Sequence, residues 1–270
     1  MAKISNSLII KPGTKFRIGN FDAGGTTGTK NKLDAQKRTA ANLVKMSGLQ
    51  YKLYAEGKRS MLIVLQGIDA GGKDGTIRHV MEAFNPLATK VTGFKAPDGA
   101  ERRHDYLWRI HKAAPEHGEI AIFNRSHYED VLVVRVHDLV PKRVWEKRYE
   151  QINDFEKLLS SNGTTILKFF LCISKDEQKE RFEERVADRT KNWKFSMGDL
   201  KEREHWDAYM AAFEDAITKC STAVAPWYVI PANKKWYRNL AVSEIITETM
   251  EAMDLKYPEG DLDAKTVKIV

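Results

Sequence analysis

The sequence lacks a hydrophobic run long enough to cross a membrane. Its longest apolar stretches, MLIVLQ at 61–66 and TTILKFFLCI at 164–173, fall well short of the ~20 residues that a transmembrane helix needs. The N-terminal stretch MAKISNSLIIKPGTKF also has too short an apolar segment for a signal peptide. From these two absences we expect a cytoplasmic protein with no membrane partner.

Cysteine is scarce as well. The chain of 270 residues has only Cys172 and Cys220, it has no C-x-x-C pair, and its 7 histidines show no metal-ligand spacing. The composition therefore argues against a disulfide framework and against a zinc site held by cysteine and histidine. Both cysteines are expected to be reduced thiols in the core.

What the sequence does have is positive charge and a core-forming composition. The formal net charge is +7 and the sequence pI is about 9.2, which indicates a polyanionic partner such as nucleic acid, a nucleotide or inorganic phosphate. Hydrophobic residues make up 42% of the chain, enough for one large α/β domain or two small ones.

Short apolar runs alternate with helical stretches along the chain. We expect strands at 61–66, 90–94, 119–124, 164–173 and 227–232, and a helix from Leu33 to about Lys58 that ends at Gly57. This alternation predicts a parallel sheet with helices on both faces. No linker or repeat divides the chain. We therefore expect a flexible N-terminal arm at 1–33, a single domain at 34–255 and a tail at 256–270.

The first expected strand runs directly into QGIDAGGKDGT at 66–76. Gly67, Gly72 and Lys73 fit the phosphate-loop signature G-x-x-x-x-G-K-[ST], but Asp74 stands where the signature has Ser or Thr. An apolar stripe with helical spacing follows at 77–84. A strand, a glycine loop, a lysine and a helix in this order predict a phosphate site; the alternative is a glycine-rich tight turn.

Two carboxylates in or beside this loop need a cation, because they would otherwise repel phosphate. Mg²⁺ prefers hard oxygen ligands, so we predict that Asp69 has a metal-binding or catalytic role. Asp74 has two interpretations, since an aspartate at this place either serves the metal or caps the following helix.

The expected strand at 119–124 ends in a second polar cluster, NRSHYED. Asn124 stands where kinases with a phosphate loop commonly have a metal-positioning acid. Arg125 has the planar fork that suits phosphoryl oxygens, and Glu129 offers a carboxylate a few residues later. The alternative is a helix capped by Ser126 with a solvated Glu129.

A charged segment at 181–209 has the pattern of a mobile lid. Arg181, Arg185 and Arg189 recur every four residues, either as phosphate ligands or as a solvated stripe paired with neighbouring glutamates. KNWKF then places cations and aromatic residues together, as in flaps that close over phosphates. Trp193 and Phe195 are either stacking surfaces for a base or local core.

Several motifs together resemble polyphosphate kinase family 2. They are QGIDAGGKDGTIRHVM, FKAP, FNRSHYEDVLVVRVH, KFFLCISKDEQKERFEER, NWKF and APWYVIPANKKWYRN, in order between Phe21 and Met253. The resemblance implies an α/β fold, a three-layer sandwich like that of P-loop kinases with a central parallel sheet and a helical lid. It also implies Mg²⁺-dependent transfer of phosphoryl groups between inorganic polyphosphate and nucleotides.

The loop chemistry and the resemblance give one set of predicted site residues. The predicted catalytic residues are Asp69, Lys73, Asn124 and Arg125. The predicted phosphate-binding residues are Gly67, Gly71, Gly72, Lys73, Asp74, Gly75, Thr76, Lys95, Arg185 and Arg189. The predicted ligands of Mg²⁺ are Asp69 and Glu129.

These features predict a kinase that moves phosphate reversibly from polyphosphate to ADP, with AMP and GDP as further candidate acceptors. Asn124 stands in place of an acid, which leaves open whether the enzyme accepts only nucleoside diphosphates. We expect a homo-oligomer that binds no nucleic acid. The alternatives are an ATP-dependent nucleoside monophosphate kinase and a non-catalytic binder of RNA. The RNA binder is disfavoured because the sequence has no RNA-recognition cluster, such as paired aromatic residues on a sheet.

Overall fold

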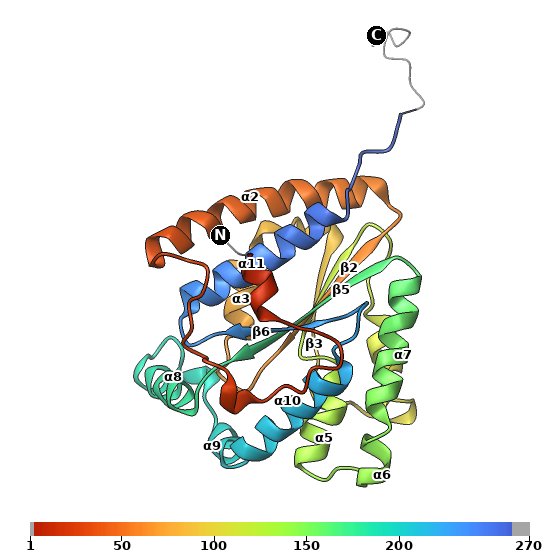
Figure 1. The fold of residues 1–270 in the computed structure, drawn as a ribbon. Helices are drawn as coiled ribbons and strands as arrows, with labels where there is room; N and C mark the ends of the chain where they lie inside the picture. The colour runs from red at the N-terminus through yellow and green to blue at the C-terminus, as the bar shows by residue number, and fades with distance from the viewer. Residues whose placement is uncertain (1–2, 261–270) are drawn as a thin grey trace.

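A six-stranded sheet with strand order β1-β6-β5-β2-β4-β3 forms the middle layer of the protein (Figure 1). The structure is a computed structural model in which residues 3–260 are described. The strands are β1 (Ile9–Ile10), β2 (Ser60–Gln66), β3 (Thr89–Gly93), β4 (Ile120–Asn124), β5 (Thr164–Cys172) and β6 (Trp227–Pro231). Strands β2 to β6 pair in parallel, and β1 pairs antiparallel with β6. The five predicted strands and the parallel sheet are confirmed.

Helices cover both faces of this sheet. They are α1 (Ile4–Leu8), α2 (Lys32–Glu56), α3 (Lys73–His79), α4 (Trp108–Lys112), α5 (Val133–Val136), α6 (Lys142–Trp145), α7 (Arg148–Ser161), α8 (Lys175–Ala187), α9 (Met197–Glu204), α10 (Trp206–Cys220) and α11 (Lys235–Ala252). Short 3-10 turns are η1 (Ile18–Asn20), η2 (Met81–Ala83), η3 (Pro86–Ala88), η4 (Glu101–Arg103), η5 (His127–Val131) and η6 (Asn192–Lys194).

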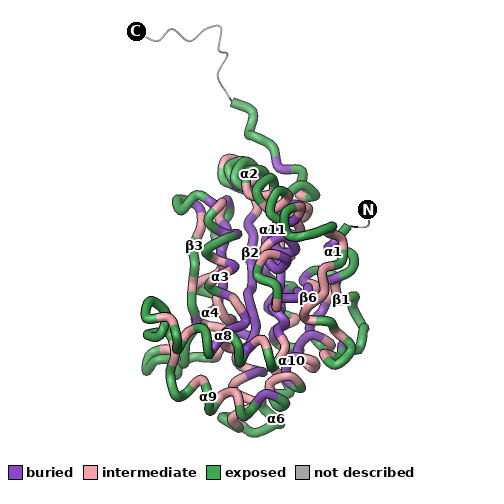
Figure 2. Tube along the Cα trace, turned by 90° about the vertical axis from the view of Figure 1, so that its left-hand side faces the viewer, coloured by how far each residue is buried: buried purple, intermediate pink, exposed green. Residues whose placement is uncertain are grey.

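Alternate residues of each central strand point into two separate cores. Met61 and Ile63 of β2 pack with α2, α3 and α11 on one face, whereas Leu62 and Val64 pack with α7 and α10 on the other. Every residue of β2 is buried (Figure 2), as expected for a strand covered on both sides. The predicted three-layer α/β sandwich is confirmed.

Helix α2 has the boundaries that its sequence predicts to within two residues. The side chain of Asn31 accepts a hydrogen bond from the backbone N–H of Asp34, which caps the first turn. Gly57 ends the helix with φ 62°, a left-handed conformation that glycine adopts without steric cost. Helix α2 packs along α11 and covers one face of the sheet (Figure 1).

The helix after the phosphate loop is shorter than its apolar stripe suggested. Helix α3 ends at His79, and Val80 leaves the helical region with φ −121° before the turn η2. Val80, Met81 and Phe84 are nevertheless buried in the core formed with α2 and α11. The apolar spacing thus reports burial here, not a continuous helix.

The N-terminal segment differs from the surface arm expected at 1–33. Ile4, Leu8 and Phe16 are buried, and β1 adds an antiparallel strand to the edge of the sheet by pairing Ile9 with Tyr228. A two-residue strand is too short to show periodicity, which is why the sequence did not predict it. The domain limits at 33 and 255 stay predictions. Within the predicted tail, 261–270 lies outside the described residues.

Within residues 3–260, no helix has both the length and the apolar character needed to span a membrane.

The two cysteines are free and buried, one in β5 and one at the end of α10, as expected. Burial raises the pKa of each thiol to about 12, so both stay protonated and unreactive at neutral pH.

A buried ion pair lies between β5 and α7. Lys168 and Glu156 have fully buried side chains, and the Lys168 ammonium donates to Glu156 Oε2 at 2.6 Å, to Tyr128 Oη at 2.7 Å and to the Cys220 carbonyl at 2.7 Å. His127 and Tyr128 contact the other carboxylate oxygen, Oε1. Both charges are therefore compensated inside the core.

Because of this arrangement, Glu156→Leu should destabilise the protein strongly, since it leaves the Lys168 charge buried without its partner. We expect a loss of roughly 3–5 kcal/mol in the free energy of unfolding, measured by denaturant titration. The double variant Glu156→Leu/Lys168→Met should recover most of that loss. Equal stability of the two variants would show that the pair does not act as a unit.

Candidate active site

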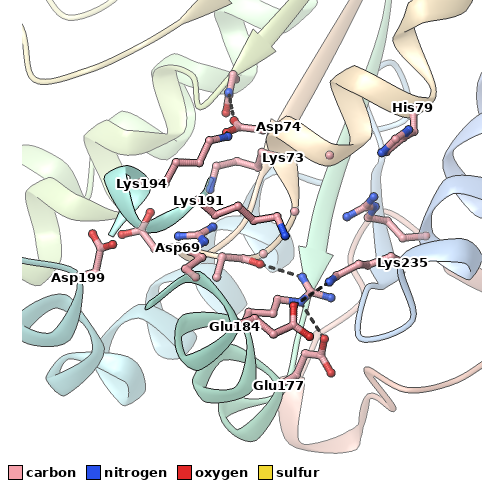
Figure 3. A pocket seen from close by; sticks show the side chains of 18 of the residues that line it. Asp69, Lys73, Asp74, His79, Glu177, Glu184, Lys191, Lys194, Asp199 and Lys235 are labelled. Carbon is pink, nitrogen blue, oxygen red and sulfur yellow. Dashed lines mark hydrogen bonds and ion pairs between the residues drawn. The ribbon is translucent and has the colours of Figure 1, made fainter. Parts of the chain in front are cut away.

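A large cavity of about 1290 Å³ lies where the carboxyl ends of β2, β3 and β4 meet α8 and the start of α11. Its walls come from the loop at 69–75, from 93–95 and 124–125, from α8, from the segment at 191–199, and from 233–239. Figure 3 shows acidic and basic side chains from these segments converging on one space. In open α/β sheets, ligands bind at this edge.

The loop between β2 and α3 has the geometry of a phosphate cradle. Gly72 is the N-cap of α3 with φ 102°, and Ala70 has φ 62°, a conformation that costs free energy outside glycine and asparagine. A Cβ added at Gly71 would lie 2.8 Å from the carbonyl oxygen of Ile68. Glycine at 71 and 72 is therefore required for this loop to close.

Lys73 reaches back over its own loop. Its ammonium donates to the carbonyl oxygens of Gly67 at 2.6 Å and Ile68 at 3.3 Å. Burial lowers its pKa, and the nearby carboxylate of Asp69 only partly offsets this effect. A phosphate bound in the loop would supply the anion that this buried cation needs.

Asp69 and Arg125 form an ion pair across the cavity. Arg125 Nη2 lies 2.8 Å from Asp69 Oδ1, and Arg125 has φ 63°. Burial lowers the pKa of the guanidinium, but the carboxylates of Glu129 and Asp69 outweigh this and raise it. The backbone strain and the pairing hold the planar fork of Arg125 beside the loop.

Asp74 does not cap α3, because Gly72 occupies the N-cap position. Its carboxylate instead accepts from Asn124 Nδ2 at 3.0 Å and from the Lys194 ammonium at 3.4 Å. Burial raises the pKa of Asp74, but these partners outweigh it and keep the pKa below its ordinary value. Asp74 therefore links the loop to the end of β4 and to the turn η6.

Glu129 does not line the cavity. Ser126 caps the turn η5 through the N–H of Tyr128, as the alternative interpretation proposed, but Glu129 is half-buried and is not the solvated acid of that alternative. Burial raises the pKa of Glu129, while Arg125 and Lys73 lower it. Its predicted role as a metal ligand therefore has no geometric support, since its carboxylate is not on the cavity wall.

Some of the other predicted residues line the cavity and some do not. Gly71, Gly75, Lys95 and Arg185 line the cavity. Arg189 does not, because α8 ends at Ala187 and Asp188 takes up extended backbone, so the four-residue spacing no longer places it on the face of Arg185. Gly67 and Thr76 act within the loop. Gly67 accepts from Lys73, and the Thr76 hydroxyl donates to the Gly72 carbonyl at 3.1 Å.

Two buried arginines lie beside the loop. Arg238 had no predicted role, and Arg181 is buried, which rules out the solvated stripe as its interpretation. Arg181 of α8 and Arg238 of α11 are 5% and 3% exposed and line the cavity. Both stand inside motifs that carry the family resemblance, KERFEER and KKWYRN. Their helical neighbours are charged or aromatic, and nothing in that pattern marks a buried guanidinium.

Cations outnumber acids around the cavity among the described residues. The lining includes ten basic residues, Lys32, Lys73, Lys95, Arg125, Arg181, Arg185, Lys191, Lys194, Lys235 and Arg238, against six acidic ones, Asp69, Asp74, Glu177, Glu180, Glu184 and Asp199. A cavity with this balance attracts polyanions.

A glycine loop after a buried parallel strand, a lysine at the start of the next helix and a cationic cavity at the carboxyl edge define a P-loop phosphotransferase. The family described as Polyphosphate kinase 2 (PPK2) matches residues 29–258. The chain belongs to this family and is an enzyme of the kinase class.

Relatives with established names cover nearly the whole chain. The AMP/ADP-polyphosphate phosphotransferase of Meiothermus ruber is 50% identical over 261 residues, which cover 96% of this chain and 98% of the relative. The ADP-polyphosphate phosphotransferase of Rhodopseudomonas palustris is 47% identical over 227 residues, covering 80% and 78%. The crystal structure of polyphosphate kinase 2 from Arthrobacter aurescens superposes with a TM-score of 0.94 at 43% identity, covering 97% of this chain and 94% of that one.

Lys73→Ala should remove most phosphotransferase turnover and leave the fold intact. We expect kcat to fall by roughly 10²–10³, the effect of one lost transition-state donor, together with a modest loss in melting temperature, because the carbonyl oxygens of Gly67 and Ile68 lose their donor. Lys191→Ala is the matched control, since this lysine lines the same cavity but is exposed and pairs with Asp188. Near-normal kcat in a folded Lys73→Ala protein would contradict the assigned role.

Proposed function

We propose that this enzyme transfers phosphoryl groups reversibly between inorganic polyphosphate and nucleotides, converting ADP to ATP and AMP to ADP, with GDP as a further acceptor. The observation that carries the proposal is the phosphate loop in a cavity where cations outnumber acids. A polyphosphate chain has no base or sugar to recognise, so a cationic groove is what its binding requires. The names of the relatives at 50% and 47% identity support polyphosphate with ADP as substrates, and the first of them also supports AMP.

The residues of the cavity have distinct tasks in this transfer. Loop amides and Lys73 hold the donor phosphates, while Arg125 and Arg185 face the space beside the loop. The transition state of phosphoryl transfer is loose and spreads charge over the equatorial oxygens. These cations therefore stabilise charge and align donor and acceptor; no covalent step on the protein is needed.

The donor set fits Mg²⁺. No group of three or more acidic, histidine or cysteine side chains placed to hold a metal occurs in residues 3–260, and Mg²⁺ needs none, because it typically takes one or two carboxylates, waters and substrate phosphates. Asp69 and Asp74 line the cavity on either side of Lys73 and would hold the ion. When bound, it would neutralise the phosphates and bring them together.

Asn124 bears on the choice of acceptor. Its side chain donates to Asp74 and is uncharged. It therefore adds no electrostatic repulsion toward the phosphates of AMP or ADP. An aspartate there would add a second carboxylate beside Asp74. We therefore include AMP with ADP as an acceptor.

The donor is tested with purified protein, polyphosphate and Mg²⁺, and with AMP, ADP or GDP as the only nucleotide. We expect ATP from ADP, ADP from AMP and GTP from GDP, followed by chromatography of the nucleotides. An ATP-dependent monophosphate kinase would give no product from AMP without ATP, and any ATP that it formed from ADP would appear with an equal amount of AMP and without polyphosphate. A non-catalytic polyanion binder would give no product under any condition. Incubation of ATP with short polyphosphate should yield ADP if the reaction is reversible.

Asp69→Asn keeps the size of the side chain and an oxygen that accepts from Arg125, but it removes the charge. If Asp69 binds the metal, the variant should lose most of its activity. The Mg²⁺ concentration that gives half of its remaining maximal rate should also be higher than for wild type. The measurement is a Mg²⁺ titration of the initial rate. Glu180→Gln is the control, because Glu180 is an exposed acid of the same cavity. An Asp69→Asn titration that overlays wild type would exclude the metal role.

A further inference from the structure

The guanidinium of Arg238 lies against the phosphate loop. Arg238 stands in the first turn of α11, is 3% exposed and lines the cavity. A Cβ added at Gly72 would lie 2.2 Å from Arg238 Nη1, and one at Gly75 would lie 3.1 Å from Nη2. The two glycines therefore leave the space that the guanidinium fills.

The guanidinium of the neighbouring Arg181 already has hydrogen-bond acceptors within the protein. Its guanidinium donates to Glu177 Oε1 at 2.7 Å, to the Ala70 carbonyl at 2.8 Å and to the carbonyls of Ala232 and Asn233. These acceptors come from α8, the phosphate loop and the end of β6. Arg181 is thus a structural crosslink that uses four of its five N–H donors on protein acceptors.

Arg238 has no such set of acceptors. Within residues 3–260, its side chain donates only to Asn239 Oδ1, from Nε at 3.1 Å and Nη2 at 2.7 Å, and it forms no ion pair with an acid. Burial and the charge of Arg181 lower its pKa to about 10, so it still carries its charge at neutral pH. An uncompensated buried charge destabilises a protein, and a bound anion would remove that cost.

The sheet order gives the direction in which such an anion extends. Strand β2, which ends in the loop, lies next to β4 and Arg125 on one side, while α11 follows β6, two strands away on the other side. Arg125 forms an ion pair with Asp69, which we assign to the metal. Arg238 forms no ion pair with an acid among the described residues. The exposed Lys32 and Lys235 line the cavity as well.

We propose that Arg238 is a binding residue for the donor polyphosphate, holding a phosphate beyond the one that is transferred, on the α11 side of the loop. This inference rests on the proposed function. The nucleotide acceptor then occupies the opposite side, toward Lys95 and Asn124. Arg238 contributes to donor affinity and leaves the affinity for the acceptor unchanged.

The test is Arg238→Gln, examined without and with ligand. Without ligand, its melting temperature should equal or exceed that of wild type, because the substitution removes an uncompensated buried charge. Tripolyphosphate alone, without nucleotide, should raise the melting temperature of wild type and much less that of the variant. In steady-state assays, the KM for polyphosphate should rise on the order of 10- to 100-fold, the loss of charge-assisted hydrogen bonds, with the KM for ADP unchanged.

Three further proteins separate the explanations. Lys234→Gln removes a charge one turn earlier from an exposed side chain that does not line the cavity, and it should change the KM for polyphosphate little. Arg181→Gln should lower the melting temperature, because it leaves loop and β6 carbonyls without their donor. Arg238→Lys keeps the charge without the planar fork and should raise the KM for polyphosphate less than Arg238→Gln does.

Three results would overturn the inference. An equal tripolyphosphate shift in wild type and Arg238→Gln, or a KM increase for ADP in place of polyphosphate, would show that Arg238 does not bind the donor. No tripolyphosphate shift in wild type, together with no product from polyphosphate and ADP, would overturn the proposed function and the inference with it.

Discussion

The site depends on the crosslink made by Arg181. One buried guanidinium binds the Ala70 carbonyl in the phosphate loop, Glu177 in α8 and two carbonyls that follow β6. Three segments far apart in the sequence are thereby fixed to one another before any ligand binds. Preorganisation of this kind lowers the free energy spent on ordering the loop during binding, and it keeps the strained backbone at Ala70 in place.

The sheet could be predicted because its strands are buried on both faces. A continuous apolar run such as 61–66 has one interpretation once helical stretches flank it. The elements that were missed or misjudged depend on packing. Strand β1 exists because Ile9 and Ile10 complete the edge beside β6, and α3 ends at His79 although the apolar stripe continues. Neither outcome is encoded in local periodicity.

In the candidate site, too, the residues that were predicted correctly follow from local sequence, and those that were misplaced or missed depend on packing. Asp69 and Arg125 were predicted separately, each from polar residues that follow an expected strand. The structure brings them to 2.8 Å, because the carboxyl ends of neighbouring parallel strands lie at one edge of the sheet. Glu129 was misplaced by the direction of a 3-10 turn and Arg189 by the end of α8. Arg238 was missed because its relation to the loop arises only when α11 packs beside α3.

The contact between Arg238 and Gly75 also links two positions across the family. Gly75 lies inside α3 with helical backbone, where alanine would favour the helix by roughly 1 kcal/mol, yet a methyl group there would lie 3.1 Å from Arg238 Nη2. In a chain that keeps this arginine, its guanidinium would have to shift by a few tenths of an ångström to accept the methyl group, which offsets part of the advantage of alanine. Residues 75 and 238 should therefore covary among relatives, with larger side chains at 75 confined to sequences that have a shorter side chain at 238.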